Sequence, residues 1–256
     1  MQVALLTVGD ELLAGDVENT NATWLARGLT ARGVSVVRIL TLPDDEALVA
    51  DYVREWSDAF DAVVTTGGLG GTHDDVTMAA VAAAFDRPLV VDETARADVV
   101  ETVEAYREAN PELFERHPDL EIDLDAQASL PEGARVLVNP EGLSPGCVLE
   151  NVYVLPGIPD EMRAMFDLVA GEFGGDTVSE TLYTPVPEGG LTDALSEARD
   201  RFDVGIGSYP SRERHNRIKV VGRDGDGVRA AVDWLREHVE IVGGPDAVVG
   251  EAGADE

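Results

Sequence analysis

The chain has almost no lysine and almost no cysteine, and each scarcity narrows what the protein does. Cys147 is the only cysteine among 256 residues, so an internal disulfide is excluded and a reducing cytoplasm is the expected location. Lys219 is the only lysine, and 19 basic residues stand against 50 acidic ones, for a net charge of −31. Surfaces that bind nucleic acid are basic, so we expect no nucleic acid among the partners.

Long apolar runs are missing as well. No stretch approaches the roughly eighteen apolar residues of a membrane span, and the first residues enter a strand without a basic leader segment. We therefore expect no membrane partner. The hydrophobic content of 44% still provides for a core, and the length suits one large α/β domain with a smaller one.

The excess of acidic residues predicts a dependence on salt. Carboxylates with few basic partners repel one another in dilute salt, whereas near 1 M salt the Debye length of about 3 Å screens this repulsion. The composition therefore indicates adaptation to a salt-rich cytoplasm. This halophilic character concerns solubility and habitat, and it does not indicate a reaction.

Apolar strands alternate with helical patterns over the first part of the chain. Strands are expected at Val3–Val8, Val34–Leu40 and Ala62–Thr66, each followed by a helix. This alternation predicts an α/β fold with a doubly wound, mostly parallel sheet. The loops after the three strands then share one rim, which is where such sheets bind ligands.

The periodic pattern weakens in two places, which sets the expected domain boundaries. Pro and acidic residues dominate 110–130, where we expect irregular structure, and 171–176 has the composition of a linker. We assign residues 1–172 to the α/β domain, 177–243 to a small α+β domain with the order β-α-β-β-α, and 244–256 to a loose acidic tail.

A glycine-rich loop follows the third expected strand. Gly67, Gly68, Gly70 and Gly71 allow positive φ and let backbone N–H groups approach a ligand, which is how a loop binds phosphate. No lysine follows these glycines, so the Walker A pattern is excluded, and their spacing differs from the G-x-G-x-x-G of dinucleotide sites. The alternative is a flexible turn closed by an aspartate cap.

Acidic residues gather at the same rim. Asp74, Asp75 and Thr77 follow the glycines at a helix start, where side-chain oxygens cap N–H groups or meet a metal. Because no lysine stands near the loop, we expect a divalent cation, Mg²⁺ or Co²⁺, to offset the charge of a phosphorylated ligand. Asp10, after the first strand, Asp74 and Asp75 are the expected metal ligands. Asp10, Asp75 and Asp44, after the second strand, are the expected catalytic residues.

Two positions at this rim leave alternatives open. His73 within the glycine loop is either a ligand or general base, or a solvated surface residue. Asp10 and its neighbour Glu11 either serve the metal or cap their own loop. The residue types alone do not separate these roles.

The most specific pattern is spread over three segments: Gly9–Leu13 with Asn19–Ala22, Thr66–Gly70 with Asp74–Thr77, and Leu155–Pro159 with Glu161–Met162. Together they resemble the molybdopterin-binding domain family shared by MoaB, MogA and the N-terminal part of the CinA proteins. The similarity covers residues 3–170. The segment Ile206–Pro210 resembles part of the small middle domain of the CinA proteins.

The resemblance implies a site for a small phosphorylated pterin or nucleotide. The MogA branch transfers AMP to molybdopterin, and the CinA branch is assigned a metal-dependent pyrophosphatase activity on ADP-ribose-like compounds. Asp75 and Thr77 match an acid and a threonine of the MogA pattern, and Asp44 matches a Pro-Asp pair. A homo-oligomer is also expected. The further ligand-binding residues that we predict are Thr66, Asn21, Gly146, Pro156, Gly157 and Glu161.

Three functions are compatible with this resemblance. They are hydrolysis of a nucleotide phosphoanhydride, adenylyl transfer to molybdopterin, and binding of a pterin or nucleotide without turnover. The CinA-like loops and the second domain favour hydrolysis over adenylyl transfer. Asp125 and Ala126 stand where relatives carry a basic pair. Because an anion contact is lost there, binding without turnover stays an open alternative.

Overall fold

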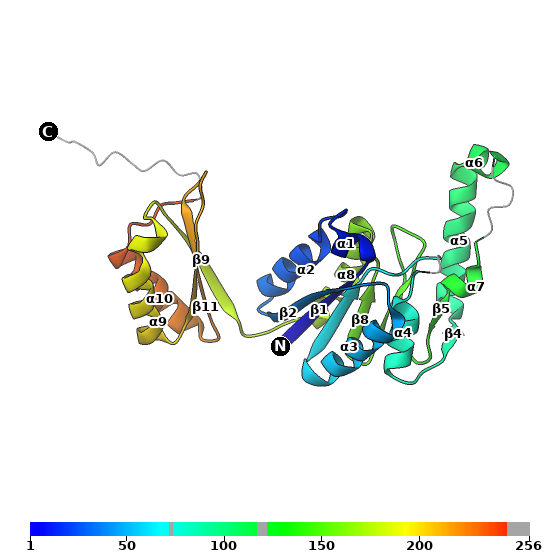
Figure 1. Ribbon diagram of the computed structural model, residues 1–256, viewed down its shortest axis with the longest axis horizontal. Coiled ribbons are helices and arrows are strands. Elements are labelled where there is room, and N and C mark those ends of the chain that lie inside the picture. The colour runs from blue at the N-terminus through cyan, green and yellow to red at the C-terminus, as the bar shows by residue number, and fades with distance from the viewer. Residues whose placement is uncertain (72–73, 117–121, 245–256) are drawn as a thin grey trace. The chain divides into compact units, whose positions relative to one another are not determined.

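The computed structural model describes residues 1–71, 74–116 and 122–244, and the chain divides into two compact units, 1–174 and 175–256. The first unit contains a six-stranded sheet of order β2-β1-β3-β8-β7-β6, of which Figure 1 labels β1, β2 and β8. The first four strands of this order run parallel, and β7 and β6 are antiparallel to their neighbours, which confirms the predicted α/β class. The strands are β1 Gln2–Val8, β2 Ser35–Leu42, β3 Ala62–Thr66, β6 Arg135–Leu137, β7 Gly146–Leu149 and β8 Val152–Leu155.

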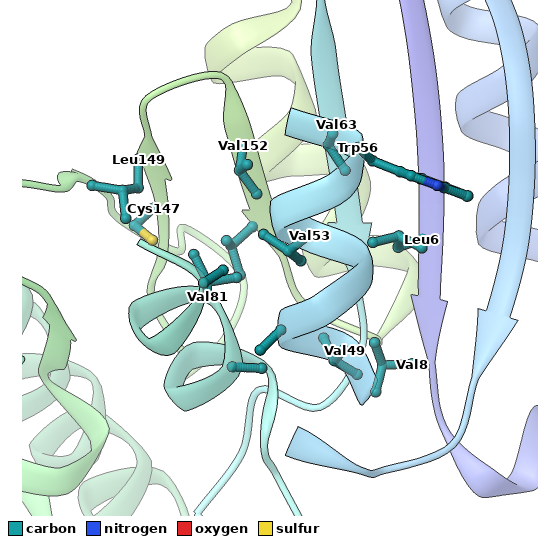
Figure 2. Packing of buried hydrophobic residues seen from close by; sticks show 14 of the residues in the cluster. Leu6, Val8, Val49, Val53, Trp56, Val63, Val81, Cys147, Leu149 and Val152 are labelled. Atoms are coloured by element: carbon teal, nitrogen blue, oxygen red, sulfur yellow. The ribbon is translucent and has the colours of Figure 1, made fainter. Parts of the chain in front are cut away.

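Helices cover both faces of this sheet because its buried strands alternate their side chains. Leu6 and Val8 of β1 join one apolar cluster with Val53 and Val81 from the helices α3 and α4 (Figure 2). The other face packs a second cluster against α2 and α8, centred on the fully buried Phe166. The helices of this unit are α1 Asp10–Ala14, α2 Thr20–Ala31, α3 Glu46–Ala59, α4 Thr77–Ala84, α5 Glu93–Ala109, α6 Pro111–Arg116, α7 Leu124–Gln127, α8 Pro159–Val169 and the 3-10 helix η1 Ala170–Glu172.

The stretch expected to be irregular, 110–130, contains short elements in its described part. Helix α6 starts with a proline in its first turn, and α7 begins after Asp123, whose Oδ1 accepts the Ala126 N–H at 2.9 Å. The strand β5, Ser129–Pro131, then pairs antiparallel with β4, Leu89–Val91. The prediction was wrong here because elements of three to six residues show no hydrophobic period.

The second unit is a smaller α+β fold. Its antiparallel sheet has the order β10-β11-β9, and the elements follow the predicted β-α-β-β-α order. They are β9 Val178–Thr184, the 3-10 helix η2 Glu188–Gly190, α9 Thr192–Phe202, β10 Gly205–Tyr209, β11 Asn216–Gly222 and α10 Gly225–His238. Residues 245–256, almost all of the expected loose tail, lie outside the described residues. Every helix in the described ranges is too short or too polar to cross a bilayer.

The thiol of Cys147 is a probe of the core of the first unit. Cys147 is fully buried in β7, and this burial raises the pKa of the thiol to about 12. Because the thiolate is the reactive form, we expect the folded chain to react with iodoacetamide at pH 8 at least a hundredfold more slowly than the denatured chain. Mass spectrometry measures the alkylation, and equal rates would contradict the buried placement.

The stability of the chain is expected to rise with salt. The surface ion pairs of the described residues, such as Arg135 with Glu172 at 2.7 Å, are exposed and worth at most about 1 kcal/mol each. They cannot offset a net charge of −31 in dilute salt. The melting temperature, followed by circular dichroism, should fall as KCl drops below about 0.5 M. A melting temperature that stays constant up to multimolar KCl would contradict the salt adaptation.

Candidate functional site

A cavity of about 620 Å³ opens in the first unit where the parallel strands β1, β3 and β8 end. This volume lies within the range of small-molecule sites. The cavity is formed by the glycine loop after β3, the turn after β8 and residues near the starts of α1, α2 and α8. Its lining includes twelve of the predicted site residues: Asn21, Asp44, Thr66, Gly67, Gly68, Gly70, Gly71, Asp74, Asp75, Pro156, Gly157 and Glu161.

The first two glycines fix the path of the loop. Gly67 and Gly68 have φ values of +102° and +62°, in the region that favours glycine. A Cβ on Gly67 would collide with the carbonyl oxygen of Val8 on the neighbouring strand, and a Cβ on Gly68 with the Thr77 hydroxyl. The Thr77 Oγ1 in turn donates to the Gly67 carbonyl at 2.8 Å. Thr77 is buried, so it holds the loop from beneath and does not line the cavity.

Asn21 ties three segments together at the floor of the cavity. Its Nδ2 donates to the Gly157 carbonyl at 2.7 Å and to the Thr66 hydroxyl at 3.3 Å. The Thr66 hydroxyl donates onward to the Pro156 carbonyl at 2.6 Å. Asn21 is free to do this because Asn19 caps α2, its side chain accepting the Ala22 N–H at 3.1 Å. The Asn21 Oδ1 is buried and has no hydrogen-bond partner among the described residues.

A buried pair of polar side chains forms one wall. Glu161, near the start of α8, accepts a hydrogen bond from the Asn139 Nδ2 at 2.7 Å, and both side chains are at least 91% buried. The same Nδ2 donates to the Ser144 carbonyl at 3.0 Å, which holds the turn 139–144 against the cavity. Behind it, burial raises the pKa of Asp98, and a hydrogen bond with the Asn139 backbone partly offsets that rise.

Of the three aspartates predicted to be catalytic, two line the cavity and one does not. Asp44 and Asp75 both line the cavity, and a Cβ on Gly70 would lie 2.8 Å from the Asp75 Oδ1, so the Asp75 carboxylate rests against the loop. Asp10 is not among the lining residues. Its backbone N–H donates to the Asp44 Oδ2 at 2.9 Å, so its position supports the orientation of Asp44. The acidic loop expected here is the short helix α1.

Two further predicted residues fall elsewhere. Gly146 is buried in β7, where a Cβ would collide with the Val154 carbonyl, and it does not line the cavity. The absence of a side chain at this position therefore serves strand packing. His73 lies outside the described residues.

Sequence reasoning missed the polar residues that come from the more irregular part of the chain. Gln127, Ser144 and Glu18 line the cavity, and Asn139 holds its wall. Gln127 ends a four-residue helix, and a Cβ on Gly71 would lie 2.6 Å from its Nε2. Position 71 therefore has no room for a side chain, because the Gln127 side chain approaches it. No local pattern links these residues, since long-range packing brings them together.

The charge of the cavity is one-sided. Among the described residues, its lining contains no arginine, lysine or histidine, and six carboxylates: Glu11, Glu18, Asp44, Asp74, Asp75 and Glu161. The described residues also contain no group of three or more His, Cys, Asp or Glu side chains placed to hold a metal ion. A metal cage made by the protein alone is therefore not present in this part of the chain.

Comparison with known proteins identifies the family. The profile described as "Probable molybdopterin binding domain" matches residues 4–173, and the profile "FAD synthase, middle domain" matches residues 176–243. The chain is 37% identical to a protein of Archaeoglobus fulgidus, over 93% of this chain and 97% of that one. It is 40% identical to a "CinA-like protein" of Gemmatimonas aurantiaca, over 74% of this chain and 42% of that longer relative.

A solved structure agrees with this assignment. The crystal structure of the protein CinA from Thermoplasma acidophilum, described as having unknown function, superposes with a TM-score of 0.59 at 30% sequence identity. The match covers 68% of this chain and 99% of that one. The chain therefore belongs to the molybdopterin-binding domain family, among its CinA-like members.

Proposed function

We propose that the first unit binds a phosphorylated pterin or a nucleotide in this cavity and hydrolyses a nucleotide phosphoanhydride of the ADP-ribose type with a divalent cation. The observation that carries the proposal is a cavity that a glycine loop lines together with six carboxylates, with no cationic side chain among the described lining residues. Family membership supports a pterin or nucleotide as the ligand.

The cation follows from the balance of charge. A diphosphate that enters a cavity lined by carboxylates is repelled unless a positive charge enters with it. Mg²⁺ usually takes one or two carboxylates and completes its shell with substrate phosphates and water, so it needs no cage of three protein ligands. Asp75, with Asp44 or Asp74, would hold the cation, which would offset the phosphate charge.

The other steps of the reaction are assigned to residues of the chain. The backbone N–H groups of the glycine loop after Gly67 bind phosphate oxygens, while the Gly67 N–H donates to the Leu155 carbonyl at 3.3 Å and Thr77 holds the loop from beneath. Asp75 accepts a proton from the water that attacks one phosphorus of the phosphoanhydride. The water oxygen stays on that phosphate and the bridging oxygen leaves on the other, so the products are AMP and ribose 5-phosphate. Asn21 fixes the floor of the cavity through its hydrogen bonds to Thr66 and Gly157.

Binding without turnover is the second candidate. It is favoured by Asp125 and Ala126, which stand where relatives carry a basic pair that would contact an anion. In that case the carboxylates orient the ligand, and the cavity sequesters a pterin or nucleotide.

The deciding experiment measures AMP release by the full chain in 2 M KCl. ADP-ribose is the first probe, and FAD is the second because the second unit matches the FAD synthase middle domain. Each is incubated with Mg²⁺, Co²⁺ or Mn²⁺, with EDTA as the control, and products are separated by chromatography. AMP that appears only with metal supports hydrolysis.

Two other results would replace this proposal. Calorimetric binding of ADP-ribose or a pterin without AMP release under any metal would establish the binding protein. Transfer of AMP from ATP to molybdopterin, with release of pyrophosphate, would establish the adenylyltransferase.

A further inference from the structure

Strand β4 leaves one edge and three apolar side chains in solvent. In the described part of the chain it pairs with β5 alone, in a sheet of two strands that Figure 1 shows beside α5 and α7. Leu89, Val90 and Val91 are 42, 40 and 41% exposed. An apolar strand with an open edge is a template for another strand, and proteins usually cover or charge such edges.

The open edge has a defined hydrogen-bonding register. The Asp92 N–H donates to the Ala128 carbonyl, and the Glu132 N–H donates to the Pro88 carbonyl, each at 2.9 Å. Hydrogen-bonded residues alternate along an antiparallel pair, so Val90 also directs its backbone groups toward β5. Leu89 and Val91 therefore direct their N–H and carbonyl groups toward the open edge.

We propose that this edge pairs with β4 of a second copy of the chain, antiparallel about a two-fold axis at Val90. In this register Leu89 of one copy exchanges two hydrogen bonds with Val91 of the other, and the second pair repeats this across the axis. All four outward backbone groups of each copy are then used. The exposed apolar side chains of the two strands lie against one another and leave water.

The charges at the two ends of β4 favour a second copy as the partner. Arg87 precedes the strand, and Asp92 and Glu93 follow it. Antiparallel pairing about Val90 brings Arg87 of one copy beside Glu93 of the other, and the symmetry repeats the contact. Arg87 is exposed and makes no ion pair within the described ranges, so its charge is available.

The edge strand β2 does not share this complementarity. Ile39 is 51% exposed on it, but Arg38 stands beside Ile39 near the middle of the strand. Two copies pairing there would bring like charges together, which is unfavourable. β2 therefore provides a matched control, because an exposed apolar residue on an edge strand can be replaced without touching β4.

The first test is the mass of the full chain in solution, by sedimentation velocity in 2 M KCl. The unmodified chain should be a dimer at about 20 μM. Val90→Asp places two carboxylates at the axis and should raise the dimer dissociation constant about a hundredfold or more, which corresponds to about 3 kcal/mol. Ile39→Asp should remain a dimer. A monomeric wild type at 100 μM, or equal loss of the dimer in both variants, would overturn the proposal.

Charge reversal tests the register itself and does not depend on Val90→Asp folding. Arg87→Glu and Glu93→Arg should each weaken the dimer roughly tenfold, measured at the lowest KCl concentration at which circular dichroism shows a folded chain. Mixing the two variants pairs opposite charges at both ends and should restore the wild-type dissociation constant, as should the double variant. A mixture no tighter than either variant alone would show that β4 does not pair in this register.

Discussion

Asp75→Asn is expected to lower the turnover of ADP-ribose about a hundredfold or more, while the melting temperature changes by only a few degrees. The asparagine keeps the size and one oxygen of the carboxylate but loses its charge. A group that acts mainly in the transition state costs turnover rather than folding when it is removed. Chromatographic AMP release and calorimetric melting, both in 2 M KCl, measure the two effects.

The control for this prediction removes a carboxylate from the same cavity. Glu18 also lines it, and no role in catalysis is assigned to it, so Glu18→Gln makes the same change of charge. Turnover in this variant should stay within about threefold of wild type. Asp75→Asn with unchanged turnover, or equal losses in both variants, would show that the carboxylates act only through the total charge of the cavity.

Much of the fold could be predicted because its central strands carry strong local patterns. The strand expected at Ala62–Thr66 is β3 with the same bounds, because β3 is a fully buried parallel strand of apolar and β-branched residues. Parallel topology then placed the loops after β1, β2 and β3 at one edge. Asp44, Asp75 and the glycines consequently line one cavity although they are distant in the sequence.

The remaining features depend on contacts that no local pattern records. Asn139 and Glu161 meet because the turn 139–144 folds back onto α8, and each residue alone reads as an ordinary polar position. Asp10 sits at the predicted rim, yet its helix uses the backbone N–H toward Asp44 and leaves the side chain outside the lining. Gly146 looks like a turn glycine in the sequence, whereas the approach of the Val154 carbonyl requires it in β7.

The glycine loop itself yields the second large effect. Gly67→Ala should lower the melting transition of the first unit by about 10 °C. A non-glycine residue at φ +102° costs about 1–3 kcal/mol, and the new Cβ also collides with the Val8 carbonyl, a backbone atom that cannot rotate away. A total near 3 kcal/mol corresponds to this shift for a unit of this size.

Two matched substitutions, one outside the glycine loop and one within it, separate the effect on folding from the effect on binding. Gly171→Ala adds a methyl group with no atom within 4 Å and should leave the calorimetric transition nearly unchanged. Gly70→Ala meets the Asp75 carboxylate, a side chain that can move, so the melting temperature should persist while ADP-ribose binding weakens about tenfold. If Gly67→Ala melts within 2 °C of wild type, the loop tolerates a side chain where β1 lies closest. Packing against β1 would then not fix the conformation of the loop, and the loop would take its phosphate-binding conformation only when the ligand is bound.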